Sequence, residues 1–115
     1  MIIVDTSVWI DFLNGTRSAL PLKTMLVENS VCALKVIEGE LRSGFIPGNR
    51  NLFFHEYSQL SFLKEPSWEE LFLYIEKEKL FGKGLSLIDM IVLATSKLNK
   101  TQVWTNDKIL KKYCN

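Results

Sequence analysis

The stretch Met1-Ile2-Ile3-Val4-Asp5-Thr6-Ser7-Val8-Trp9-Ile10-Asp11 decides the fold of this chain. Its apolar run at residues 2–4 predicts a short buried strand. Thr6 or Ser7 has the kind of side chain that caps a helix, and we expect a helix directly after the strand. The apolar side chains that share one face of this helix are Val8, Trp9, Phe12 and Leu13. A strand that leads straight into a helix is typical of α/β folds, and Asp5 lies at the junction.

The same alternation of strands and helices continues through the 115 residues. Further strands are expected at residues 30–34, 60–63 and 102–104. Helices are expected at residues 18–28, 35–44, 51–59 and 86–98, from the Ser67–Glu70 capping box onward, and after Thr105 as N-cap. No repeat or linker interrupts this order, so we predict one α/β domain over residues 1–115. Its sheet is expected to be mostly parallel, with helices on both faces.

The composition narrows the class of protein. The net charge of +1 gives no strong basic field for nucleic acid, although a bound metal ion would add positive charge that this count misses. Cys32 and Cys114 fit neither a zinc-ligand spacing nor a disulfide framework. The chain shows no secretory signal pattern and no long apolar run. We therefore expect a cytoplasmic protein that does not contact a membrane.

Four acidic side chains stand at the ends of expected elements or beside helix starts: Asp5, Glu40, Asp89 and Asp107. Asp5 and Asp107 follow the first and last strands, Glu40 lies in the helix after the second strand, and Asp89 lies in a first helical turn. Ligand sites in parallel sheets form outside the carboxyl ends of the strands, so the fold could gather all four acids at one edge. Oxygen ligands of this kind suit hard divalent cations such as Mg²⁺. The pattern therefore favours a metal-dependent nuclease.

Each acid also has a structural explanation. Asp89 stands three residues after Ser86, which is the spacing of a capping box, and Asp107 could stabilise the first turn of the last helix. Glu40 could be a solvated helix residue. Asp5 is harder to explain in this way, because no Lys or Arg lies within ten residues and a buried carboxylate needs a cation or hydrogen bonds. Either a metal ion or backbone N–H groups at the helix start would satisfy it.

Other catalytic machineries lack their residues in this chain. His55 is the single histidine, which excludes mechanisms that need a histidine pair. Neither a glycine-rich phosphate loop nor a G-x-S-x-G elbow occurs. A phosphatase of the haloacid-dehalogenase type needs a second Asp two residues after the first, where this chain has Ser7. The four acids are therefore the candidates for chemistry.

Four segments taken together resemble the PIN-domain ribonucleases, specifically the VapC toxins of bacterial and archaeal toxin–antitoxin pairs. They are residues 5–11 (DTSVWID), 40–44 (ELRSG), 85–89 (LSLID) and 104–107 (WTND). The resemblance covers essentially the whole chain. Residues 45–65 match no motif, and Lys108-Ile109 replaces the aromatic residue often found after the last acid, which leaves the choice of substrate open.

This resemblance implies a three-layer α/β/α sandwich with a short, mostly parallel sheet. It also implies cleavage of RNA that depends on Mg²⁺ or Mn²⁺, a homodimer, and a cognate antitoxin protein that blocks the site. The implied metal ligands are Asp5 and Asp89, completed by Glu40 and Asp107. The implied supporting hydroxyl groups are those of Thr6 and Thr105.

Basic and aromatic residues near these motifs are candidates for contact with RNA. Arg42 and Lys108 could meet the phosphate backbone. For Lys111 and Lys112, an ordinary basic end of a helix is an equal explanation. Trp9 and Trp104 could stack on bases. As large aromatic residues beside apolar runs, they are expected instead in the core or in a dimer interface.

The expected chemistry is hydrolysis by a metal-activated water, which would leave a 5′-phosphate and a 3′-hydroxyl. Two other functions stay open on the same fold. One is a nuclease of RNA processing that is not a toxin. The other is a non-catalytic binding module whose acids serve only as helix caps.

Overall fold

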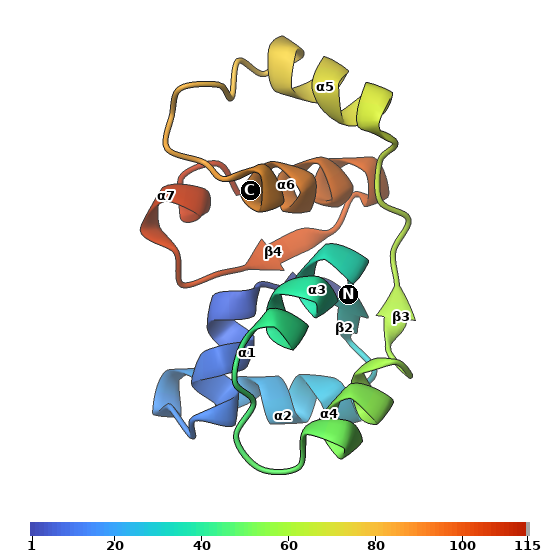
Figure 1. Ribbon diagram of the computed structural model, residues 1–115, viewed down its shortest axis with the longest axis vertical. Coiled ribbons are helices and arrows are strands. Elements are labelled where there is room, and N and C mark those ends of the chain that lie inside the picture. The colour runs from blue at the N-terminus through green and yellow to red at the C-terminus, as the bar shows by residue number, and fades with distance from the viewer. Residues whose placement is uncertain (115) are drawn as a thin grey trace.

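The computed structural model describes residues 1–114 and shows a four-stranded sheet between two layers of helices (Figure 1). The strands are β1 (Ile2–Val4), β2 (Val31–Ala33), β3 (Ser61–Phe62) and β4 (Gln102–Trp104). Their order is β3-β2-β1-β4, and each neighbouring pair is parallel. This confirms the expected parallel sheet.

The first strand is paired on both edges, with β2 on one side and β4 on the other. In the register of the sheet, Ile3 lies between Cys32 of β2 and Val103 of β4. Ile3 and Cys32 are buried, as expected for strands covered on both faces. The carboxyl ends of β1 and β4 therefore lie side by side, which brings Asp5 next to Thr105.

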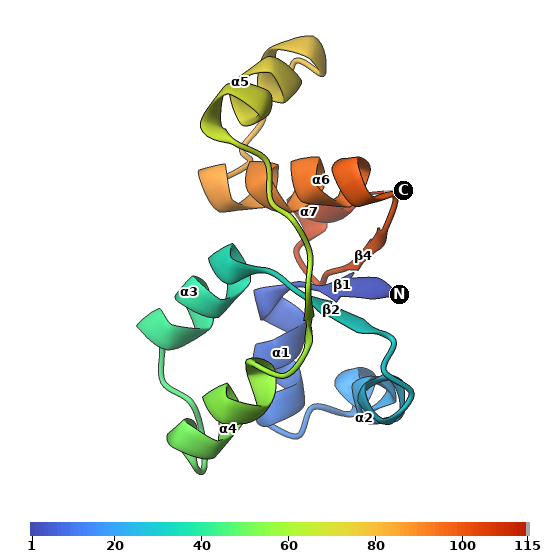
Figure 2. The ribbon, with the colours of Figure 1, turned by 90° about the vertical axis from the view of Figure 1, so that its right-hand side faces the viewer.

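Seven α-helices complete the described chain: α1 (Thr6–Leu13), α2 (Pro21–Val27), α3 (Lys35–Ser43), α4 (Arg50–Tyr57), α5 (Trp68–Lys77), α6 (Leu87–Asn99) and α7 (Lys108–Lys111). In both ribbon views α5, α6 and α7 lie on one side of the sheet, and α1, α2 and α4 lie on the other (Figures 1 and 2). Helix α3 contacts both α1 and α6. The arrangement confirms the three-layer α/β/α sandwich.

Most element boundaries agree with the sequence patterns within a few residues, and three expectations need correction. Asp5, rather than Thr6 or Ser7, is the N-cap residue of α1. The last helix has Asp107 as its N-cap instead of Thr105, because the Asp107 side chain itself accepts the N–H groups of the first turn. The helix expected at residues 18–28 is a short 3₁₀ turn, Arg17–Ala19, followed by α2, which begins at a proline that needs no N–H partner there.

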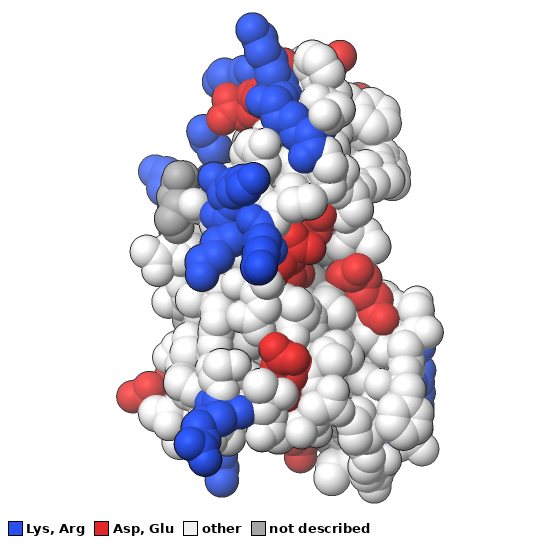
Figure 3. All heavy atoms as spheres, turned by 90° about the vertical axis from the view of Figure 1, so that its left-hand side faces the viewer, with Lys and Arg blue, Asp and Glu red and all other residues white. Residues whose placement is uncertain are grey.

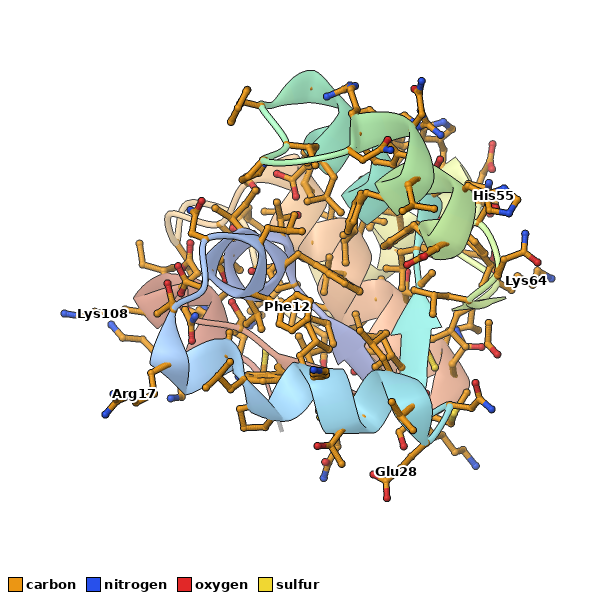
Figure 4. The ribbon with its side chains drawn as sticks, turned by 90° about the horizontal axis from the view of Figure 1, so that it is seen from below. Phe12, Arg17, Glu28, His55, Lys64 and Lys108 are labelled. Carbon is orange, nitrogen blue, oxygen red and sulfur yellow. The ribbon has the colours of Figure 1, made fainter. Side chains whose placement is uncertain are left out.

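The apolar side chains form two clusters. The larger one joins the sheet to α1–α4 and contains Trp9 and Cys32, both buried as expected. The smaller one joins Leu80, Leu93 and Leu110 under α5–α7. Seen from the α2 side, Phe12 points inward while His55 points outward (Figure 4). Within residues 1–114, no helix combines the length and apolar character needed to span a membrane.

Candidate active site

Asp5 stands at the carboxyl end of β1 and is buried, with 6% of its surface exposed. It occupies the N-cap position of α1, but its side chain accepts no capping hydrogen bond from the helix. Its Oδ2 instead accepts hydrogen bonds from the hydroxyl of Thr105, at 2.7 Å, and from that of Ser7, at 3.0 Å. The carboxylate thus points toward the end of β4 and away from the N–H groups of its own helix.

The environment of Asp5 contains hydrogen-bond donors but no counter-charge. Within residues 1–114, the side-chain ion pairs involve Glu38 and Glu78, and none involves Asp5. Both donors to Asp5 are neutral hydroxyl groups. A buried carboxylate without a cation is costly, so a positive ligand bound to Asp5 would be stabilising.

Thr105 couples Asp5 to Asp107. The Thr105 hydroxyl donates to Asp5 and accepts the backbone N–H of Asp107 at 3.0 Å. Asp107 Oδ1 accepts the N–H groups of Ile109 and Leu110, each at 2.9 Å, and so caps α7. The structural explanation for Asp107 is therefore realised, and its second oxygen makes no hydrogen bond within the described chain.

Glu40 joins this region from α3. Thr6, the residue after Asp5, donates its hydroxyl to Glu40 Oε1 at 2.5 Å. Glu38 lies about 200° around the helix from Glu40 and has a different set of partners. It accepts hydrogen bonds from Lys35 and Arg42, which fits the expectation that the two glutamates do not share one role.

Asp89 lies in the first turn of α6 and closes a capping box there. Its N–H donates to Ser86 Oγ and its Oδ2 accepts the N–H of Ser86, both at 3.0 Å. The loop before this helix runs against α7, since a Cβ on Gly84 would lie 3.5 Å from Cδ1 of Ile109. Gly84 also has a φ of +83°, a conformation that glycine adopts without strain. Asp89 is thereby held on the same side of the sheet as α7.

The thiol of Cys114 lies within electrostatic reach of two of the acids. Burial raises the pKa of Cys114, and the negative charges of Asp5 and Asp89 raise it further.

The donor set suits a divalent cation bound partly by water. No three acidic, histidine or cysteine side chains within residues 1–114 are placed to hold one ion by themselves. Mg²⁺ does not need such a closed set, because it keeps several waters and binds through one or two carboxylates plus substrate phosphate. Asp5, which lacks a counter-charge, fits this mode best. Thr105 links it to Asp107, and the next residue, Thr6, donates to Glu40. The hydrogen bonds of the Asp89 side chain within residues 1–114 go to Ser86 alone.

The basic residues near the acids differ in their freedom to meet a substrate. Arg42 donates to Glu38 Oε2 at 2.8 Å and lies over the ring of Phe54 at 4.2 Å, on the face of α3 turned away from Glu40. Lys108 is exposed in the first turn of α7 and points outward (Figure 4). On the face that carries α7, acidic side chains lie between groups of Lys and Arg (Figure 3). Of the two expected RNA contacts, the geometry leaves Lys108 available.

No signal in the sequence indicated the contacts that Ser7, Asp11 and Asn106 make with one another. Ser7 Oγ accepts the N–H of Asn106 at 3.0 Å while it donates to Asp5. Asn106 Nδ2 donates to Asp11 Oδ2 at 2.7 Å. All three belong to the quoted motifs, but their contacts join residues separated by 95 positions or more. Such contacts depend on the tertiary fold and have no local pattern.

Comparison with known proteins gives a consistent result. The sequence pattern of the PIN domain family matches residues 2–115. Ribonuclease VapC32 of Mycobacterium tuberculosis, recorded for strains CDC 1551 and H37Rv, is 31% identical to this chain. The similarity extends over 99% of this chain and 90% of that protein.

Proposed function

The chain belongs to the PIN domain family, and from that premise we propose that it is a metal-dependent endoribonuclease acting as the toxin of a toxin–antitoxin pair. The ribonuclease name of its relative supports this activity, because the similarity extends over nearly the whole length of both proteins. The four acids of the site supply the only candidate catalytic groups of the sequence, and hydroxyl groups hold three of them or their neighbours in place.

The observation that carries the proposal is the state of Asp5. It is buried, stands at an N-cap without capping, and has only neutral partners. A carboxylate used for helix stability would accept the N–H groups of the first turn, as Asp107 does. A buried carboxylate without a counter-charge is costly for the fold, so its presence here supports a role in binding a cation.

Each residue of the site has a proposed role in binding the metal ion or the RNA. Asp5 and Asp89 would bind Mg²⁺ or Mn²⁺, and Glu40 and Asp107 would complete the negative pocket. A bound ion would supply Lewis acidity that activates water near neutral pH and stabilises charge on the phosphodiester. Lys108 would contact the RNA backbone beside the pocket. The products would carry 5′-phosphate and 3′-hydroxyl ends.

We also propose that the chain forms a homodimer and is held inactive by a cognate antitoxin. Helix α5 and the loop after it expose large apolar side chains, namely Trp68, Phe72, Leu73 and Phe81. Apolar groups gathered in this way are typical of protein interfaces, and a second copy of the chain is the occupant that we propose. Sedimentation of wild type and Leu73→Glu tests this, since a monomer for both at micromolar concentration would contradict the proposal.

The function is tested by incubating purified protein with total RNA in Mg²⁺ or in EDTA and mapping the new 5′ ends. We expect discrete 5′-phosphate ends in Mg²⁺, and none with EDTA or with Asp89→Asn. Expression of both proteins in bacteria should give growth arrest for wild type alone. Cleavage that persists in EDTA, or ends that carry cyclic phosphate, would contradict the proposed chemistry.

A further inference from the structure

Two side chains on one face of α1, Ser7 and Asp11, accept hydrogen bonds from Asn106. Ser7 and Asp11 are four residues apart, so their side chains lie one above the other on the helix. Ser7 Oγ accepts the backbone N–H of Asn106 at 3.0 Å, and Asp11 Oδ2 accepts its side-chain amide at 2.7 Å. Asn106 is exposed and belongs to no cluster of apolar side chains. Within residues 1–114, these two hydrogen bonds are the contacts that attach Asn106 itself to α1.

Asn106 lies between two residues of the candidate site. Thr105, on one side, donates to Asp5, and Asp107, on the other, is the N-cap of α7. Ser7 itself donates to Asp5, so one hydroxyl connects the buried acid to the Asn106 backbone. The segment at residues 105–107 is thus connected to the start of α1 by hydrogen bonds that each involve a side chain of Asp5, Ser7 or Asp11.

We propose that Asp11 and Asn106 are positioning residues that hold the segment at residues 105–107, and so set the place of Asp107 relative to Asp5. The part of this inference that concerns metal binding rests on the proposed function. Asp11 does not act as a further metal ligand in this arrangement. It lies six residues after Asp5, about 9 Å along the helix axis, and its Oδ2 is engaged by Asn106.

We call the hydrogen bond between the Asn106 amide and the Asp11 carboxylate the clamp. The chemistry of these two side chains predicts which substitutions preserve it. Asp11→Asn removes the charge but keeps an oxygen that can accept from the Asn106 amide. Asp11→Ala and Asn106→Ala remove the hydrogen bond from either side. A ligand role for Asp11 would make Asp11→Asn as harmful as Asp11→Ala, whereas a positioning role predicts that Asp11→Asn restores most of the wild-type behaviour.

The test compares these variants, the double variant Asp11→Ala/Asn106→Ala and the control Glu28→Ala, which removes an exposed charge at the end of α2. Two quantities are measured: hydrogen exchange of the amides of Asn106 and Asp107 by NMR without metal, and Mn²⁺ affinity by calorimetry. For either alanine variant we expect about tenfold faster exchange and about tenfold weaker Mn²⁺ binding, equivalent to the loss of one hydrogen bond. The double variant is expected to match the single ones, because they break the same bond.

Each outcome decides one question. If the amides of Asn106 and Asp107 exchange in Asp11→Ala at the wild-type rate, Asp11 does not hold this segment, whatever the RNA-cleaving activity of the protein. Faster exchange with unchanged Mn²⁺ affinity would overturn its role in placing Asp107. Equal loss of Mn²⁺ affinity in Asp11→Asn and Asp11→Ala would overturn positioning in favour of direct ligation. A wild type that binds no Mn²⁺ and cleaves no RNA would refute the proposed function, while the exchange rates would still judge the clamp.

Discussion

Two acids of this protein stand at the beginning of helices and are used in opposite ways. Asp89 closes a capping box with Ser86 in the first turn of α6. Asp5 occupies the N-cap of α1 but turns its carboxylate to the hydroxyls of Ser7 and Thr105, without a capping bond. The difference shows that a carboxylate at a helix start is not necessarily there for the helix. Asp89 stabilises the fold whether or not it binds a ligand, whereas Asp5 is buried without a counter-charge and without a capping bond, which favours the proposed role in binding a cation.

The largest effect is expected for Asp5→Asn. The amide oxygen can accept both hydroxyl hydrogen bonds, so the variant removes the charge and little else. We expect RNA cleavage to fall at least about a hundredfold, as for loss of a group that stabilises the transition state. The rate of cleavage under single-turnover conditions measures this. Activity within a factor of two of wild type would exclude Asp5 from the catalytic site.

Thr105→Val tests the connection between Asp5 and Asp107. It preserves the shape of a buried side chain but removes its hydroxyl from both hydrogen bonds. We expect a loss of about 1–3 kcal/mol in the free energy of unfolding, together with lower activity. Urea denaturation gives the first quantity. Thr101→Val, which removes a half-buried hydroxyl at the other end of β4, is the matched control and should retain full activity.

For Asp89, two different substitutions should affect stability and activity separately. Ser86→Ala removes the cap partner and leaves the Asp89 carboxylate in place. We expect it to cost about 0.5–2 kcal/mol in the free energy of unfolding, with near-normal cleavage by the folded fraction. Asp89→Asn is expected to lower cleavage strongly, although less than Asp5→Asn. Full activity of Asp89→Asn would show that Asp89 is only a cap.

The smallest effect concerns Glu38, which lies near the site without belonging to it. Partial burial disfavours its ionised form, but hydrogen bonds from Arg42 and Lys35 and their positive charges outweigh this and hold its pKa below the usual value of 4.5. A lowered pKa in the folded state stabilises the protein above the pKa of the unfolded chain, and this contribution is lost as pH falls through the folded value. Wild type should therefore lose stability relative to Glu38→Gln below about pH 4.5. A pH-independent difference in melting temperature would contradict this.

Local sequence patterns were sufficient for the fold because each element carries its own signal. The strand at residues 2–4 was predicted from its apolar run and the capping box at Ser67 from its spacing, and both are confirmed. The spacing of Ser86 and Asp89 indicated a capping box as one of two explanations for Asp89, and the structure contains it. The 3₁₀ turn before Pro21 was not predicted, since the apolar spacing there continued across it.

The site was less predictable than the fold. Which groups satisfy Asp5 depends on Thr105, a hundred positions away, and no local pattern reports that contact. Local patterns also give no sign of the hydrogen bonds that Ser7 and Asp11 accept from Asn106. The roles of the four acids in metal binding therefore stay predictions, drawn from residue type, position and the resemblance to a family.

The most direct test of the central claim, that Asp5 is retained for a cation rather than for the fold, pairs two measurements on wild type and Asp5→Asn. One is calorimetric titration with Mn²⁺, and the other is the melting temperature without metal. We predict that Asp5→Asn loses Mn²⁺ binding while its melting temperature stays equal or rises, because a buried uncompensated charge has been removed. Unchanged Mn²⁺ binding together with a lower melting temperature would contradict the account and assign Asp5 to the fold.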